Sequence, residues 1–392
     1  MLPARRSLQT MSSLAILGAG MQGVAAAYDC ALYGDFDRIV LADFAPAKAE
    51  VGAERINRLL GREVCGWAAF DATDRQALRL FLADHSLAIG ALPYKLHFPA
   101  EEVGVEVGCG VVDMGQDTEP ALAIHARDAQ AKAKGVAVVT DCGLAPGLVN
   151  VFAADLIARC EGATHAVAYC GGLPCEPIPP LGYALRFSME SVIGEYSDEV
   201  LALRDGEIVT IGPMGDLESI EFDGVGPLEA FSTSGGSGTA PYSFRGRIAN
   251  YEYKTMRYPG HAAAMKLFRD CGFWSEEPHG RLGTSPRAAF SAVLEERLAF
   301  PDVADMILVR VEVRSPVETL RIELVERDDP ATGFTAMERL TGFSTAIVAL
   351  AIRSGHIAPG CHGCEAAIDP AHFEAELRRR GIGIRRSGLR LG

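Results

Sequence analysis

The stretch Leu14-Ala15-Ile16-Leu17-Gly18-Ala19-Gly20-Met21-Gln22-Gly23 decides the fold of the first part of this chain. Its first four residues form an apolar run typical of a strand that is buried in a parallel sheet. The three glycines suit a tight turn, a close approach of the backbone to a ligand, and packing of a helix on the strand. An Ala-rich segment of high helix propensity follows. The pattern predicts a βαβ unit in which residues 18–23 bind a pyrophosphate at a helix N-terminus.

A second predicted strand, residues 37–42, leads into Asp43. Asp43 follows Gly18 by 25 positions, near the spacing of about 20 at which an acidic residue binds the ribose hydroxyls of a dinucleotide. A carboxylate here would repel the 2′-phosphate of NADP, and the next residue is Phe44 rather than an arginine. We therefore expect a Rossmann domain that binds NAD, with an unliganded Rossmann-like fold as the alternative.

The carboxyl ends of later strands are expected at the same edge of the sheet, beside the cofactor. One strand is expected to end just before Asp71, which could meet the adenine edge or cap the next helix. The strand over 87–92 continues toward Tyr94, which could act on a substrate amine beside the nicotinamide or simply pack in the crevice wall. The residues at this strand end that we expect to contact the cofactor are Ala91, Leu92 and Pro93.

The pattern changes after Asp141, where a Gly/Pro-rich turn opens a helix. Seven strand-like runs with few helices between them predict a mixed or antiparallel sheet in an α+β domain. These runs are 164–170, 183–188, 207–211, 218–222, 248–258, 305–314 and 318–327. The predicted fold class is thus α/β plus α+β. Its parts are a flexible arm (1–12), a Rossmann NAD-binding domain (13–141), a substrate and dimerisation domain (142–335), and C-terminal helices that pack back on the Rossmann domain (336–392).

Charge and cysteine content limit the partners. The formal net charge of −14 repels phosphate backbones and anionic lipids, so we expect neither a nucleic-acid nor a membrane partner. Ten scattered cysteines without a secretory leader favour a reduced, cytoplasmic protein. Cys361 and Cys364 have a metal-like spacing, but no second pair completes four ligands, so no metal is expected. Edge strands of the second sheet lead us to expect a homodimer or a higher homo-oligomer.

Six short stretches carry a family resemblance. The chain from Gly18 to Ile382 resembles the saccharopine dehydrogenase family, which the segments Asp141–Asn150, Gly171–Pro174 and Leu181–Tyr183 indicate. Members oxidise or reduce a C–N bond at the end of a lysine-derived side chain with a nicotinamide cofactor. Three other segments resemble the L-lysine 6-dehydrogenase branch: Phe187–Glu190, Gly226–Gly236 and Glu252–His261.

The resemblance implies a reaction. It is the NAD-dependent oxidative deamination of the terminal amine of L-lysine to a semialdehyde, which cyclises, with release of ammonia. One alternative is a saccharopine or related opine-type dehydrogenase or reductase that acts on a secondary amine. An alternative of another class is a non-catalytic NAD-binding regulator.

The chemistry calls for a base and a carboxylate clamp. An ammonium has no lone pair to expel hydride, and the reference pKa of the lysine amine is about 10.4, so the site must deprotonate it. His261 is the candidate base, and a role in capping the following helix is the alternative. Arg257 is the candidate clamp because its guanidinium binds carboxylates bidentately. Lys254, three residues earlier in a predicted strand, should point to the opposite face.

Four more charged residues are candidates for substrate contact. Glu190 and Glu229 could hold the α-ammonium of the substrate or be ordinary surface charges. Arg186 could grip a further carboxylate. Asp141, at the domain junction, is expected to act as a cap or hinge residue that could also touch the substrate.

Overall fold

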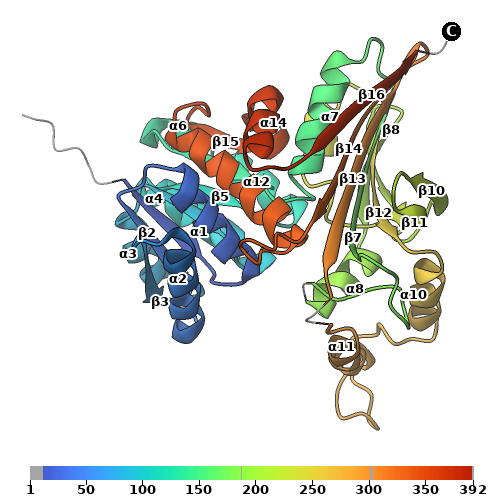
Figure 1. The fold of residues 1–392 in the computed structure, drawn as a ribbon, viewed down its shortest axis with the longest axis horizontal. Coiled ribbons are helices and arrows are strands. Elements are labelled where there is room, and N and C mark those ends of the chain that lie inside the picture. The colour runs from blue at the N-terminus through green and yellow to red at the C-terminus, as the bar shows by residue number, and fades with distance from the viewer. Residues whose placement is uncertain (1–11, 187, 301–302, 391–392) are drawn as a thin grey trace, which may run out of the picture.

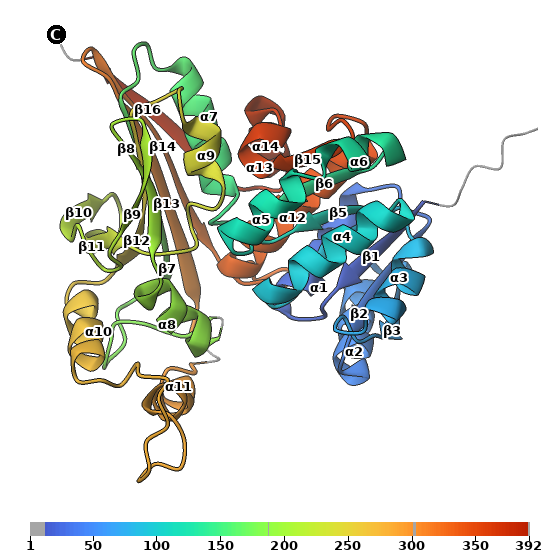
Figure 2. The ribbon, with the colours of Figure 1, turned by 180° about the vertical axis from the view of Figure 1, so that it is seen from behind.

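The structure, a computed structural model, describes residues 12–186, 188–300 and 303–390. Of the flexible arm expected over residues 1–12, only Ser12 is among these. Two sheets with separate helical layers dominate the described chain (Figures 1 and 2). In the described ranges, no helix has the length and apolar character that crossing a bilayer requires.

The first sheet is parallel and has seven strands in the order β15-β6-β5-β4-β1-β2-β3. Helices α1, α2 and α12 pack on one face, while α3, α4, α5 and α6 pack on the other. The strands are β1 (Ser13–Leu17), β2 (Arg38–Asp43), β3 (Cys65–Ala69), β4 (Leu87–Gly90), β5 (Gly110–Asp113), β6 (Ala137–Thr140) and β15 (Gly360–Gly363). The helices are α1 (Met21–Tyr33), α2 (Pro46–Leu60), α3 (Arg75–Ala83), a 3-10 turn (Tyr94–Leu96), α4 (His97–Val107), α5 (Thr118–His125), α6 (Asp128–Lys134) and α12 (Ala336–Arg353).

The second sheet is mixed and has nine strands. Its main path is β10-β11-β12-β7-β13-β14-β16, and β8 joins β12 and β9. Only β7 and β12 run parallel among these pairs. The strands are β7 (His165–Pro174), β8 (Val200–Arg204), β9 (Glu207–Ile211), β10 (Glu218–Phe222), β11 (Gly226–Ser232), β12 (Asn250–Arg257), β13 (Asp305–Arg314), β14 (Glu318–Arg327) and β16 (Ile384–Arg390). The remaining helices are α7 (Leu148–Arg159), α8 (Met189–Ser197), α9 (Ala240–Phe244), α10 (His261–Asp270), α11 (Pro286–Arg297), α13 (Cys364–Ala367) and α14 (Pro370–Arg379).

The predicted fold class, a Rossmann domain followed by a mixed-sheet domain, is confirmed. The strand expected over 183–188 is wrong: residues 183–186 have no regular structure, residue 187 lies outside the described ranges, and Ser188 caps α8. The tail contains strands as well as the expected helices, because β15 extends the Rossmann sheet and β16 extends the second sheet. The tail therefore contributes to both domains.

Helix α12 lies directly against α1, which ties the tail to the nucleotide half of the molecule (Figure 1). A continuous core of buried residues runs from β1 and α1 through α7 and α12 to β13. The two cysteines with metal-like spacing belong to different clusters, since Cys364 packs in this core and Cys361 packs on the other face of the Rossmann sheet.

We predict that Gly342→Leu strongly destabilises the fold. A Cβ atom at position 342 would lie 2.7 Å from Ala25 Cβ and 3.0 Å from both Ala26 N and Gln22 O in α1. Overpacking of this kind costs about 3 kcal/mol, because backbone cannot move aside cheaply. The free energy of unfolding in urea measures the loss. Gly383→Leu is the control, since no atom lies within 4 Å of a Cβ there; equal stability of both variants would contradict close packing of α12 on α1.

Candidate active site

A pocket of about 430 Å³ opens at the carboxyl edge of the parallel sheet. Seven predicted cofactor residues line it: Gly18, Gly20, Asp43, Asp71, Ala91, Leu92 and Pro93. Ala19 and Met21 line an adjoining groove between α1 and α2. Gln22 points to a different cavity, described below, and Gly23 is buried under the turn.

The glycine-rich turn fits a dinucleotide pyrophosphate. Gly18 has a φ of +108°, and a Cβ there would lie 2.2 Å from Ala91 O. A Cβ at Gly23 would lie 1.9 Å from Gly18 O, so a side chain would separate the helix from the turn. A Cβ at Gly20 would have no atom within 4 Å, so the space beside this residue is open to a phosphate. No side chain caps α1, so its first N–H groups are free to bind an anion.

Asp43 is held rigidly at the end of β2. Its Oδ2 accepts a hydrogen bond from Ala19 N at 2.8 Å, and its Oδ1 accepts one from Ala45 N at 2.8 Å. Lys48 of α2 lines the same pocket. A carboxylate and an ammonium therefore both border the space where the adenosine end of a dinucleotide would lie.

Asp71 also lines this pocket, after the neighbouring strand β3. Its Oδ1 accepts hydrogen bonds from Thr73 N at 2.9 Å and from Thr73 Oγ1 at 2.6 Å, and these bonds lower the pKa of the Asp71 carboxyl. The alternative role of Asp71 as a helix cap is wrong, because Asp74 caps α3 through bonds from the backbone of residues 76 and 77.

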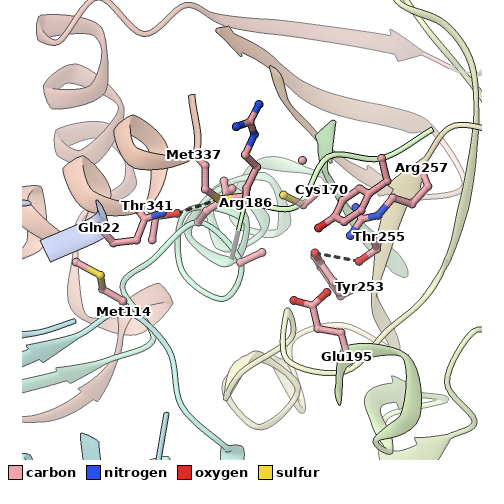
Figure 3. Close-up of a pocket in the computed structure, with 14 residues that line it drawn as sticks. Gln22, Met114, Cys170, Arg186, Glu195, Tyr253, Thr255, Arg257, Met337 and Thr341 are labelled. Atoms are coloured by element: carbon pink, nitrogen blue, oxygen red, sulfur yellow. Dashed lines mark hydrogen bonds between the residues drawn. The ribbon is translucent and has the colours of Figure 1, made fainter. Parts of the chain in front are cut away.

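A second cavity of about 220 Å³ lies between the two domains (Figure 3). Gln22 of its lining lies within the glycine-rich motif, so the cavity adjoins the region where a bound dinucleotide would lie. One side is mainly apolar and comes from Gln22, Met114, Leu144, Ala145, Met337 and Thr341. The other side, in the second domain, is polar and comes from Cys170, Gly172, Tyr183, Arg186, Glu195, Tyr253, Thr255 and Arg257.

Arg257 ends strand β12 and brings a buried guanidinium to the cavity. Its Nε donates to Tyr196 Oη at 2.9 Å and its Nη1 donates to Met256 O at 3.0 Å. Within the described ranges, Arg257 forms no ion pair with a carboxylate of the chain. A buried cation without a direct ion pair is costly, so this arrangement favours an anionic ligand. Lys254 points to the opposite face of the sheet, where Nζ lies 2.6 Å from Glu218 Oε1.

Glu195 of α8 is the acidic side chain in this cavity, and the sequence reasoning missed it. Figure 3 shows its carboxylate below Tyr253, on the same side of the cavity as Arg257. Burial raises the pKa of Glu195 to about 7, although the positive charge of Arg257 opposes this shift. A carboxyl group with a pKa near neutrality can accept a proton at physiological pH.

Arg186 adds a second guanidinium to the lining. One of its amino groups donates to Val303 O, while its buried Nε has no hydrogen-bond partner in the described part of the chain. Two guanidinium groups and one carboxylate therefore border the cavity, so its polar side is suited to a substrate that carries at least one carboxylate and one amine.

His261, the predicted base, lies behind the cavity wall and is buried. Both ring nitrogens are engaged: Nε2 lies 3.1 Å from Tyr196 Oη and Nδ1 lies 3.0 Å from Leu181 O. Burial, with help from the charge of Arg257, lowers the pKa of His261 to about 3. The geometry keeps His261 out of the cavity lining, whereas Glu195 is part of it.

The two glutamates expected to hold an ammonium lie outside the cavity. Glu190 is exposed on α8, where Oε1 pairs with Arg287 Nη2 at 2.7 Å. Glu229 takes the capping role for α10, because its carboxylate accepts hydrogen bonds from Gly260 N at 2.9 Å and from Ala262 N at 2.5 Å. These contacts join residues far apart in the chain, so the sequence around Glu190 and Glu229 does not indicate them.

Asp141 and Tyr94 also stay apart from the cavity lining. Asp141 is fully buried at the domain junction, and its carboxylate accepts bonds from Gln116 N at 3.3 Å and Thr239 N at 3.2 Å. These bonds link the two domains at Asp141. Tyr94 is 45% exposed in the turn after β4, where its ring contacts Lys95 Nζ rather than the cavity.

Comparisons with known proteins agree with this architecture. Residues 14–139 match the saccharopine dehydrogenase NADP binding domain, and residues 143–382 match the saccharopine dehydrogenase C-terminal domain. The chain is 26% identical over 218 residues to a saccharopine dehydrogenase [NADP(+), L-glutamate-forming] of Pyricularia oryzae, covering 53% of this chain and 48% of that protein. It is 29% identical over 149 residues to the enzyme of the same name from Saccharomyces cerevisiae, covering 36% and 33%. The chain spans about half the length, or less, of these curated relatives.

Two solved structures share the fold over almost the whole chain. Apo saccharopine dehydrogenase (L-Glu forming) from Saccharomyces cerevisiae has a TM-score of 0.79 at 19% identity, covering 96% of this chain and 100% of that one. Homospermidine synthase from Legionella pneumophila in complex with NAD has a TM-score of 0.68 at 11% identity, covering 97% and 91%. The family matches together cover nearly all of both domains, and the chain belongs to the saccharopine dehydrogenase family.

Proposed function

We propose that the protein is an NAD-dependent dehydrogenase that removes the terminal amine of L-lysine or of a closely related amino acid. The observation that carries the proposal is the buried Arg257, which forms no direct ion pair in the described chain and faces the same cavity as Glu195. The guanidinium would bind the substrate carboxylate bidentately. The amine and its carbon would then lie between Glu195 and Gln22, where Glu195 can reach the amine and the carbon can face the cofactor.

Glu195 would serve as the base in this reaction. A bound nicotinamide cofactor would supply the hydride acceptor. The substrate amine must lose a proton before hydride can leave the adjoining carbon, and Glu195 lies in the cavity with a pKa near the working pH. Water then adds to the resulting imine, ammonia leaves, and the aldehyde can close into a ring. Closure of the two domains on the ligand would keep bulk water away during hydride transfer.

The fixed carboxylate of Asp43 supports NAD as the cofactor, and we predict that Asp43→Ala combined with Phe44→Arg reverses this preference. The double change removes a charge that repels a 2′-phosphate and adds one that attracts it, so the ratio of kcat/KM for NAD to that for NADP should fall at least about tenfold. Initial rates with each cofactor measure the ratio. An unchanged ratio would mean that Asp43 does not contact the ribose.

Lys48 provides the complementary variant. It borders the same pocket, so an enzyme that uses NADP would lose kcat/KM for NADP in Lys48→Ala. If NAD is the cofactor, Lys48→Ala leaves kcat/KM for NAD within about twofold, because NAD has no 2′-phosphate for this charge to bind.

Arg186 favours a second candidate function. A saccharopine-type substrate has an additional dicarboxylate arm, and a second guanidinium with a buried, unpartnered Nε suits an additional carboxylate. The reaction would then form or break a secondary amine.

A substrate screen separates these candidates. Purified enzyme is incubated with NAD or NADP and with lysine, saccharopine or other amines, and reduced cofactor is followed by absorbance. The proposal expects turnover with lysine alone. Turnover with saccharopine but not lysine supports the second candidate, and NAD binding without turnover of any amine supports a regulator.

A further inference from the structure

Three hydrogen bonds in series hold the Arg257 guanidinium from behind. Arg257 Nε donates to Tyr196 Oη at 2.9 Å, Tyr196 Oη lies 3.1 Å from His261 Nε2, and His261 Nδ1 lies 3.0 Å from Leu181 O. The four residues come from β12, α8, α10 and the loop before α8. The bonds thus link separate elements of the second domain to one cation in the cavity wall.

The chemistry of the groups fixes the direction of every bond. A carbonyl oxygen only accepts, so His261 Nδ1 carries the proton and His261 Nε2 must accept from the Tyr196 hydroxyl. That hydroxyl oxygen is then free to accept from Arg257 Nε. A protonated imidazole would place a second donor against Tyr196. The burial of His261 and the nearby charge of Arg257 lower the pKa of the imidazole to about 3, so the ring is neutral.

The remaining donors of Arg257 are turned toward the cavity. A guanidinium has five N–H groups, and Nε and one Nη1 donor are used by Tyr196 and the backbone of Met256. Tyr183 and Tyr196 flank the guanidinium, with ring centroids 5.0 and 5.9 Å from Cζ. Three N–H groups on the outer edge stay available, enough for a bidentate bond to a carboxylate.

We propose that Tyr196 and His261 are positioning residues that set the orientation of Arg257 for the carboxylate end of the substrate. The inference rests on the proposed function for the identity of that carboxylate. In this role His261 does not transfer a proton to or from the substrate. His261 orients the Tyr196 hydroxyl, and Tyr196 fixes the guanidinium plane.

The direct test is binding of a carboxylate probe to enzyme loaded with NADH. The probe is 5-aminopentanoate, and its Kd is measured by calorimetry for the wild type and for Tyr196→Phe. We expect Tyr196→Phe to weaken probe binding at least about tenfold while the Kd for NADH stays within about twofold. Tyr258→Phe is the matched control, because its hydroxyl donates to Pro174 O at 3.0 Å and Cys175 O at 3.2 Å and is not hydrogen-bonded to Arg257, Tyr196 or His261. Equal probe affinity in Tyr196→Phe and the wild type, or equal weakening in both variants, overturns the proposal.

Substitutions at position 261 separate positioning from catalysis. Glutamine can still accept a hydrogen bond from Tyr196 and leucine cannot, so His261→Gln should retain more probe affinity than His261→Leu. Both variants should keep the acid limb of the kcat/KM profile near pH 7, which Glu195 sets. If His261→Leu loses the acid limb of the kcat/KM profile, His261 acts as the base and the inference is overturned. Probe binding without turnover of any amino acid would instead refute the proposed function and leave the positioning role intact.

Discussion

Replacing Glu195 by glutamine is expected to lower kcat for amine oxidation by at least about a hundredfold. The amide keeps the size of the side chain but cannot accept the amine proton, and general-base catalysis contributes roughly 10²–10⁴ in rate. Steady-state rates of NADH formation measure the loss. Glu190→Gln on the same helix is the control, since Glu190 pairs with Arg287 at the surface, and it should retain kcat within about twofold.

The pH profile gives the same assignment a second test. The base must be deprotonated to act, and the pKa of Glu195 is about 7, so kcat/KM of the wild type should fall as the pH drops below about 7. Glu195→Gln should lack this limb. A variant that retains both wild-type kcat and the acid limb would show that another group takes the proton.

Replacing Arg257 by leucine is expected to lower kcat/KM for the amino-acid substrate about a hundredfold or more. The change removes a bidentate, charge-assisted contact, and a loss of about 3 kcal/mol corresponds to roughly a hundredfold. Most of the loss should appear in KM, because the clamp binds an end of the substrate remote from the reacting carbon. The kinetic constants with lysine, and the Kd for NADH as a check on folding, measure it.

Lys254→Met is the matched control for this variant. Lys254 lies on the same strand as Arg257 but pairs with Glu218 on the other face of the sheet, so its loss should change kcat/KM by less than about twofold. Equal losses in both variants would mean that Arg257 acts through the stability of β12 rather than through the substrate.

The nucleotide half could be predicted from sequence because its signals are local. The strand, the glycine-rich turn, the helix and Asp43 lie within residues 14–43, and turn geometry dictates Gly18 and Gly23. The second domain was harder to predict. The run over 183–188 is predicted as a strand, but Tyr183 and Arg186 line the cavity and Ser188 caps α8 instead.

The substrate site depends on contacts that no sequence window contains. Glu195 lies five residues after Glu190, and at 3.6 residues per turn this spacing places the two carboxylates on different faces of α8. Which face meets the cavity is decided by packing against the second sheet. The partners of His261 lie 65 and 80 positions away in sequence, so nothing near His261 indicates that both ring nitrogens are occupied.

The most direct measurement follows the nitrogen that leaves the substrate. Enzyme and NAD are incubated with lysine that carries ¹⁵N at the terminal amine, and in parallel with lysine labelled at the α-amine. The proposed function predicts one labelled ammonium for each NADH from the first substrate, while the second keeps its label in the cyclised product. Release of the α-label, or NADH formation without ammonium, would contradict it.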